Sequence, residues 1–302
     1  MIWNGKYALT SKRGLSVAIG TPGGVYVIGG YDLDISDCSG KNEIFKDGAW
    51  TAKAAMPTAK DHIQAALVDG RIWVPGGNPA STENVSYSIT DDEWVTHEPP
   101  PFDIWQHAIA GLDGSLYVFG GSEDPQNDKR CLRYDIEGDA WLEIAPMPDI
   151  SRFMARAEVY DGKILLFGGM NMDNNQFARR VVEYDPAEDT WRDVCAMPMP
   201  MAEFGFAKYR NYFLCAGGLT APGYVANEFR ATDRTFIFDL ETMSFFEGPP
   251  LPVGGYGCPM ICDGDGVKLF GLGLWGQTDL LTDIFETDPI YFLFWNSIKQ
   301  AA

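Results

Sequence analysis

The sequence is poor in basic residues, in histidine and in long apolar runs. Its 302 residues include 23 lysines and arginines against 42 aspartates and glutamates, with three histidines and a formal net charge of −19. This balance disfavours nucleic acid and anionic membranes as partners, although a local basic pocket remains compatible with it. No run reaches transmembrane length, and no basic stretch followed by an apolar one marks a secretion signal. We therefore expect a soluble, cytoplasmic protein that is a monomer or a weak oligomer.

The six cysteines show no Cys-x-x-Cys spacing, so we expect neither a zinc site nor disulfides. The acidic run Asp32–Asp37 imitates part of a calcium loop, but it lacks the glycine required at the sixth position. The sequence contains no P-loop, dinucleotide fingerprint or Ser-His-Asp arrangement. These absences predict a protein without metal or cofactor, and they leave no covalent nucleophile to assign.

Glycine doublets are what the sequence has in abundance. They recur every 44 to 55 residues, and an aromatic residue lies 26 or 27 residues before each of them. The doublets are Gly29-Gly30, Gly76-Gly77, Gly120-Gly121, Gly168-Gly169, Gly217-Gly218 and a degenerate Leu272-Gly273; the aromatics are Trp3, Trp50, Trp94, Trp141, Trp191 and Phe245. Six copies in register indicate a repeat architecture.

One copy, from Arg152 to Pro198, shows what each repeat predicts. Two apolar runs are joined by Asp161-Gly162, a two-residue signal for a tight hairpin. The second run ends at the doublet, where glycine permits positive φ and close backbone approach. Two further strand-like runs follow, with an aromatic residue in each. Each repeat is therefore predicted to be a four-stranded antiparallel sheet.

A period near 50 with a glycine doublet and a late tyrosine–tryptophan pair resembles the kelch repeat. The resemblance covers nearly the whole chain and implies an all-β, six-bladed β-propeller that forms a single domain over residues 1–302. The blades are expected at residues 15–52, 63–96, 107–144, 155–194, 204–247 and 257–295 plus 2–8. The doublet glycines and the tryptophans are then structural residues.

Two alternatives exist for closing the ring. Trp3 stands where the repeat places its fourth-strand aromatic, so Ile2–Ala8 is expected to supply the outer strand of the last blade, with Ile290–Trp295 as its third strand. In the rival arrangement Phe285 and Phe292, which are seven residues apart, mark the third and fourth strands. We favour closure by the N-terminal strand.

In propellers, ligands bind at the channel mouth, on the loops that lead into each innermost strand and on those that follow the doublets. We call the first set the lead-in segments. Charged and histidine side chains fall there by register, and aromatic residues lie beside them. The predicted catalytic residues are Glu203, His62, His107, Arg13 and Arg152; the predicted ligand-binding residues are Asp61, Trp105, Gln106, Phe153, Tyr256, Trp275 and Tyr31.

A histidine near a carboxylate exchanges protons near neutral pH, and an arginine can hold an anionic group. The kelch resemblance also gives arginine and histidine a structural role at these positions, bonded to main-chain carbonyls of neighbouring blades. Glu203 has no such structural reason to be there.

Two functions remain open. The first is a small-molecule binder at the mouth, with metal-free isomerase, cyclase or lyase activity; some bacterial kelch proteins are sugar mutarotases or epimerases. The second is a protein- or peptide-binding module, the commoner use of kelch rings, with aromatic residues of the same face as anchors.

Overall fold

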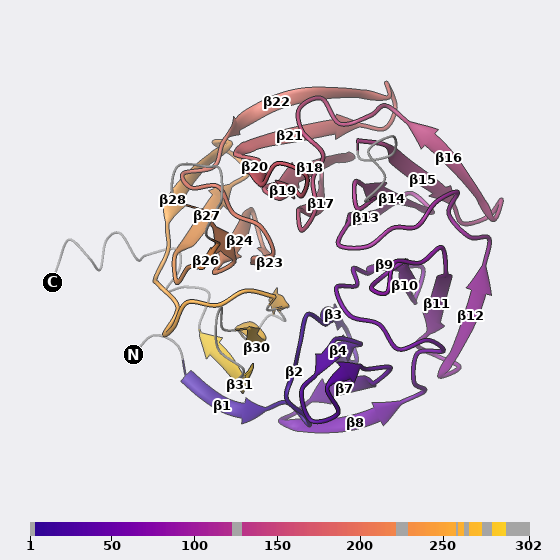
Figure 1. Cartoon of the computed structure of the whole chain (residues 1–302), viewed down its shortest axis with the longest axis vertical. Coiled ribbons are helices and arrows are strands. Elements are labelled where there is room, and N and C mark those ends of the chain that lie inside the picture. Colours follow the sequence, from indigo (N-terminus) through magenta and orange to yellow (C-terminus); the bar gives the residue numbers. More distant parts are fainter. Residues whose placement is uncertain are drawn as a thin grey trace, which may run out of the picture.

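The chain is described here by a computed structural model that covers residues 4–122, 129–221, 229–257, 259–262, 266–273 and 280–287. Within these residues every regular element is a β-strand, which confirms the all-β prediction. The strands form six four-stranded antiparallel sheets arranged around a central axis like the blades of a propeller (Figure 1).

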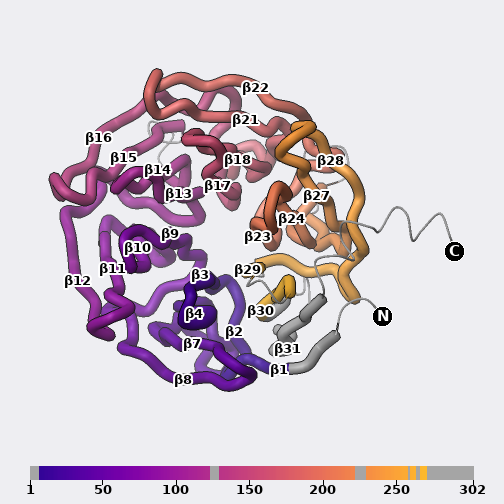
Figure 2. The backbone as a smooth tube through the Cα atoms, turned by 180° about the vertical axis from the view of Figure 1, so that it is seen from behind, coloured from indigo at the N-terminus to yellow at the C-terminus, as the bar shows by residue number. Residues whose placement is uncertain are grey.

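Each blade runs from an innermost to an outermost strand. The innermost strands β3, β9, β13, β17, β23 and β29 surround the centre when the ring is seen from behind (Figure 2). The blades are β3 (Val17–Thr21), β4 (Gly24–Ile28), β7 (Asn42–Lys46), β8 (Ala49–Lys53); β9 (Ala66–Val68), β10 (Arg71–Pro75), β11 (Asn84–Ser88), β12 (Glu93–His97); β13 (Ala108–Leu112), β14 (Ser115–Phe119), β15 (Cys131–Asp135), β16 (Ala140–Ile144); β17 (Arg156–Tyr160), β18 (Lys163–Phe167), β21 (Arg180–Asp185), β22 (Thr190–Ala196); β23 (Gly205–Tyr209), β24 (Tyr212–Ala216), β27 (Thr235–Asp239), β28 (Ser244–Glu247); and β29 (Met260–Cys262), β30 (Val267–Gly273), β31 (Leu280–Thr287), β1 (Asn4–Ala8). We number them one to six in this order.

The two faces of the ring differ in their connections. Tight turns such as Asp161-Gly162, with φ of 52° and 71°, join the first and second strands on one face, which we call the hairpin face. The lead-in segments and the loops after the doublets lie on the other, the loop face. Short extra strands extend three of these loops: β2 (Arg13–Gly14), β5 (Tyr31–Asp32) and β6 (Asp37–Cys38); β19 (Met170–Asn171) and β20 (Gln176–Phe177); and β25 (Leu219–Thr220) and β26 (Arg230–Ala231).

The ring is closed by the N-terminal strand. β1 pairs antiparallel with β31, with Asn4 opposite Glu286 and Ala8 opposite Asp283. This confirms that an N-terminal strand is the outer strand of blade six, whereas Trp3 itself lies outside the described residues. Closure in this way leaves no free sheet edge between the first and last blades.

The predicted third strand of blade six is wrong. β31, at Leu280–Thr287, occupies the place that we assigned to Ile290–Trp295, which lies outside the described residues. The misassignment followed from apolarity, because the run IYFLFW is the more strongly apolar of the two. β30 also continues through Leu272-Gly273, past a bulge between Phe270 and Leu272, instead of ending before the degenerate doublet.

The glycine doublets are required where one blade meets the lead-in segment of the next. A Cβ atom on Gly76 would lie 2.1 Å from the carbonyl oxygen of Ile104, so no larger residue fits. The amide of Gly77 donates to that same oxygen at 2.9 Å. The doublet therefore sets the distance between neighbouring blades, which explains its recurrence in the sequence.

The late aromatic residues join blades at the outer rim. The indole Nε1 of Trp94 donates to the carbonyl of Ala54 in the preceding blade at 2.8 Å, and the Ala54 amide donates to Asp92 Oδ1. The Tyr87 hydroxyl donates to the same carboxylate oxygen at 2.6 Å. Blades three and four repeat the arrangement with Tyr134, Asp139 and Trp141, and with Tyr184, Asp189 and Trp191. The tryptophans are thus structural, as expected.

Candidate functional site

Six main-chain hydrogen bonds form a closed ring at the loop-face end of the channel. One residue from each lead-in segment donates its amide to the carbonyl of the equivalent residue in the preceding blade, at 2.7–3.3 Å. All six have positive φ. They are Leu15, His62, Gln106, Met154, Glu203 and Gly257, in blade order. We call them the ring residues. The main chain alone builds this ring, so its side chains are free to differ between blades.

Two of the ring side chains meet across the axis. His62 belongs to blade two and Glu203 to blade five, which lies opposite it in the ring (Figure 1). The imidazole Nε2 of His62 lies 3.5 Å from Glu203 Oε1. Both side chains are largely buried, with exposed fractions of 18% and 8%. The pair therefore blocks the loop-face end of the channel at its centre.

Asp61 orients the histidine. Its Oδ1 lies 2.6 Å from His62 Nδ1 and also accepts a hydrogen bond from the Asn78 side-chain amide at 2.6 Å. Its Oδ2 lies 3.6 Å from the Cys38 thiol. A carboxylate on Nδ1 places the imidazole proton on that side and directs Nε2 toward Glu203. Asp61, His62 and Glu203 thus form one chain of ionisable groups, all three of them predicted from the sequence.

The environment shifts both titrating groups of the pair. Burial raises the pKa of Glu203, and the positive charges of His62 and Arg156 only partly oppose this. Burial alone would lower the pKa of His62, but its hydrogen bond to Asp61 and the charges of Glu203 and Asp61 outweigh it, so the pKa is raised. The carboxylate is therefore a stronger base than an exposed glutamate, and the imidazolium persists closer to neutral pH.

Aromatic side chains surround this chain on the loop face. The rings of Trp105 and His62 lie 5.9 Å apart in a T-shaped arrangement, and Trp105 and Phe153 lie 6.1 Å apart. The charge of Glu203 helps to raise the pKa of Tyr256, after the larger effect of burial. Tyr31 pairs with the lead-in segment of its own blade at Gly14. Trp275 lies outside the described residues.

Two buried polar atoms beside His62 have no hydrogen-bond partner. They are the indole Nε1 of Trp105, a donor, and the side-chain Oε1 of Gln106, an acceptor. Buried polar groups are normally satisfied. An unpaired donor and an unpaired acceptor next to an acid–base pair are what a polar ligand would use.

The predicted arginines are held elsewhere. Arg13 donates to the carbonyls of Gly29 and Lys41 and lies 2.5 Å from Glu43. Arg152 donates in the same way to Gly168, Arg180 and Asp149. Both side chains are fully buried. Each lies two residues before its ring residue and bonds its own blade, so this geometry matches their structural role.

His107 also points away from the axis. Its side chain is fully buried against Gly121. A Cβ atom added to Gly121 would lie only 2.6 Å from the Cβ of His107. Neither ring nitrogen has a hydrogen-bond partner. Burial and the nearby charge of Lys60 lower its pKa to about 3, so the imidazole is neutral at physiological pH. Of the predicted catalytic residues, the structure brings together only His62 and Glu203.

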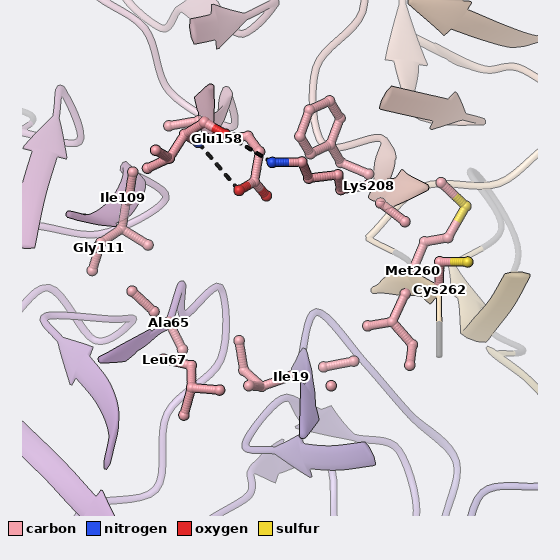
Figure 3. Close-up of a pocket in the computed structure, with 18 residues that line it drawn as sticks. Ile19, Ala65, Leu67, Ile109, Gly111, Glu158, Lys208, Met260 and Cys262 are labelled. Carbon is pink, nitrogen blue, oxygen red and sulfur yellow. Dashed lines mark hydrogen bonds between the residues drawn. The ribbon is translucent and has the colours of Figure 1, made fainter. Parts of the chain in front are cut away.

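Below the ring the channel holds charged residues that the sequence reasoning missed. Two cavities of 410 Å³ and 150 Å³ share much of their lining and follow the innermost strands. Figure 3 shows the larger one. Arg156 and Glu158, both on β17, line the smaller cavity, and Lys208 on β23 lines the larger one. The signal was present in the sequence, because RAEVY places two charged side chains on one face of an innermost strand.

Over the described ranges, no three histidine, cysteine, aspartate or glutamate side chains lie close enough to bind a metal ion. The same part of the chain contains no helix with the length and apolarity needed to cross a membrane.

Comparisons with known proteins agree with this architecture. The kelch motif matches residues 106–148 and 151–198. The chain is 23% identical over 250 residues to Kelch-like protein 35 of Mus musculus, which covers 76% of this chain and 41% of that protein. It is 26% identical over 230 residues to Kelch-like protein terF of Aspergillus terreus, covering 69% and 49%. With Kelch repeat and BTB domain-containing protein 12 of Danio rerio, the identity is 28% over 56% of this chain and 28% of that protein.

A solved structure described as the structure of YjhT shares the fold. The TM-score is 0.76 at 16% sequence identity, over 92% of this chain and 95% of that one. The chain spans less than half the length of each of the three curated relatives named above. The matched motif, the relatives and the six four-stranded blades together show that this chain is a kelch-repeat protein with a β-propeller fold.

Proposed function

We propose that the protein binds a small organic ligand on its loop face and transfers protons on it through Glu203 and His62, as a metal-free isomerase, cyclase or lyase. The observation that carries this proposal is the pairing of the two side chains across the axis, with His62 fixed on Asp61. The main-chain ring does not require these two residues, since leucine, methionine and glycine fill equivalent positions.

The chemistry follows from the two altered pKa values. Glu203, as carboxylate, removes a proton from a carbon or hydroxyl of the ligand, while protonated His62 donates its Nε2 proton to the ligand oxygen that gains negative charge. Return of the Glu203 proton to a neighbouring atom, and of the oxygen proton to His62, regenerates both groups and leaves an isomer. Asp61 holds the Nδ1 proton throughout.

The surrounding residues fit a polar ligand with a planar or apolar face. Trp105 Nε1 can donate to it and Gln106 Oε1 can accept from it, which would satisfy both buried atoms. The rings of Trp105, Phe153 and Tyr256 belong to one apolar cluster beside the pair, which would offer a ligand an apolar surface.

The test is a solvent-exchange experiment that does not require the product to be known. A panel of sugars, hydroxy acids and keto acids is first screened for thermal stabilisation of the protein. Stabilising compounds are then incubated in D₂O, and proton NMR records the replacement of carbon-bound hydrogen by deuterium. The wild type should catalyse exchange on at least one of them.

Glu203→Gln keeps the shape of the side chain but removes the base, so exchange should stop. Glu188→Gln, an exposed change in the turn after β21, is the matched control and should exchange like the wild type. A ligand that undergoes exchange equally with Glu203→Gln would refute the assignment of the base.

A second candidate function, binding of a protein or peptide, is favoured by the exposed tips of two loop-face hairpins. Ile35, in the turn between β5 and β6, is 63% exposed, and Met172, between β19 and β20, is 38% exposed. These hairpins belong to blades one and four. Large apolar side chains on projecting loops are typical of contact surfaces.

This candidate is tested with the double variant Ile35→Glu and Met172→Glu. If the loop face captures a protein, proteins co-purifying with the wild type should be lost from the double variant, whereas Leu142→Glu, on the outer strand β16, should retain them. Retention by the double variant would exclude this surface.

A further inference from the structure

The channel below the His62–Glu203 pair is a chamber with its own opening. Its two cavities share Ile19, Ala65, Ile109 and Glu158 among their lining residues, so they form one space. The ring and the His62–Glu203 pair close its inner end. At the outer end, next to the tight hairpins, Lys208 is exposed and Leu67 is 39% exposed. A solute therefore reaches the chamber from the hairpin face, opposite the loop face.

A positive and a negative group face this space from one strand. Arg156 and Glu158 are two residues apart on β17, so both point to the same side of the strand. Arg156 Nε donates to the carbonyl of Phe204 at 3.0 Å, which fixes the guanidinium at the inner end. Glu158 Oε1 accepts from the Val159 amide at 3.2 Å, and the carboxylate projects toward the open centre (Figure 3).

The inner end also carries a neutral side-chain amide. Gln64 lines the smaller cavity together with Arg156. A guanidinium in a cavity that also holds an amide is suited to a carboxylate oxygen.

The charges that flank the chamber select the kind of ligand. Glu203 above Arg156 and Glu158 below it oppose a simple anion, as does the net charge of −19. Arg156 lies two residues before Glu158 on the same strand, and the positive charge of Lys208 acts on Glu158, so both oppose a simple cation. A ligand that carries both charges close together meets neither penalty.

We propose that the chamber is a second binding site, for a small zwitterion of the α-amino acid type. Its carboxylate lies against Arg156, and its ammonium group lies against Glu158. The apolar side chains of Ile19, Ile109, Phe206 and Met260 line the remaining wall and contact the ligand's own side chain. This site is independent of the loop-face function proposed above.

The test compares three molecules that differ only in their charged groups. The probes are L-leucine, 3-methylbutylamine, which lacks the carboxylate, and 4-methylpentanoate, which lacks the ammonium group. Binding to the purified protein is measured by saturation-transfer NMR and calorimetry, with L-alanine and L-phenylalanine as probes of side-chain size. At least one amino acid should bind, and the amine and the acid should bind at least about tenfold more weakly than leucine.

Glu158→Gln should weaken amino-acid binding about tenfold or more, because it removes the partner of the ammonium group. Glu188→Gln, far from the channel, should leave it unchanged. Arg156→Gln, checked for an unchanged melting temperature, should weaken the binding of leucine without restoring that of the amine.

Three results would overturn the proposal. They are the absence of binding by all three amino acids at about 10 mM, equal binding of 4-methylpentanoate and leucine, and unchanged leucine affinity in Glu158→Gln. Deuterium exchange at the loop face is scored separately with Glu203→Gln, so failure of one site leaves the other testable.

Discussion

Each lead-in segment contains two positions, two residues apart, whose side chains point in different directions. The outer position holds Arg13, Lys60 and Arg152 in blades one, two and four, and Ile104 and Met201 in blades three and five. Each of these cations bonds main-chain carbonyls of its own blade and pairs with a nearby carboxylate. The ring position holds His62 and Glu203, whose side chains cross the axis to each other.

Within one short segment, the outer position therefore carries charged residues that support the fold, and the ring position carries charged residues that are available for function. An outer cation neutralises main-chain oxygens that the fold has already buried, so its removal should affect stability. At the ring position the main-chain amides and carbonyls bond to each other. The Glu203 side chain is buried there although burial raises its pKa and so disfavours the charged form. Its removal should affect chemistry and leave the fold intact.

The largest effect should come from the outer position. Arg152→Met leaves Asp149 and the carbonyls of Gly168 and Arg180 without their donor, although methionine fills the equivalent place in blade five. We expect a loss of about 3–5 kcal/mol in the free energy of unfolding, because a buried ionic partner is removed. Urea unfolding measures it.

Adding Asp149→Asn to Arg152→Met should recover part of that loss, because no uncompensated carboxylate then remains near the blade. A single variant that unfolds at the same urea concentration as the wild type would show that the outer cation is not structural.

His107, directly after the ring position, should make the protein sensitive to acid. Its pKa is lowered to about 3 in the folded state from an ordinary value of 6.5. The unfolded chain therefore binds a proton that the folded chain refuses, and stability falls as the pH drops below 6.5. The loss should reach about 2 kcal/mol at pH 5.

His107→Leu should flatten this slope, since Ile63 and Phe204 fill equivalent positions in other blades. The measurement is urea unfolding between pH 7.5 and pH 5, in steps of about half a unit. Equal slopes in the variant and the wild type would assign the acid sensitivity to other groups.

The smallest effect on stability should come from the ring. Glu203→Gln should change the free energy of unfolding by less than about 1 kcal/mol at pH 7. Because the pKa of Glu203 is raised above its ordinary 4.5, the wild type loses stability as the pH rises through the folded-state value, and the variant lacks this component. A loss as large as that of Arg152→Met would contradict the separation between the two positions.

The repeat made most of the fold predictable from the sequence. The doublets recur because each contacts the next lead-in segment, as Gly76 contacts Ile104, and the tryptophans recur because each bonds the preceding blade. Blade six was mispredicted in its third strand, where the doublet has decayed to Leu272-Gly273 and register gives no guide. An apolar run was then preferred over the true strand, β31.

The site was predictable in its members but not in its geometry. Aligning the repeats places His62 and Glu203 near equivalent positions, and only the order of the blades reveals that blades two and five face each other. Arg13 and Arg152 were grouped with them because proximity in sequence hides the outward direction of their side chains. Arg156 and Glu158 lie inside a strand, where a propeller gives less reason than its loops do to expect ligand-binding residues.

The most direct test of the His62–Glu203 pair is an NMR titration of the His62 imidazole in the wild type and in Glu203→Gln. The geometry predicts a His62 pKa above 6.5 in the wild type, because Asp61 and Glu203 favour the charged imidazolium. Glu203→Gln should lower it by about half a unit or more, since one of two negative partners is lost. An unchanged His62 pKa in the variant would show that the two residues do not interact across the axis, and the proposed acid–base pair would fail with it.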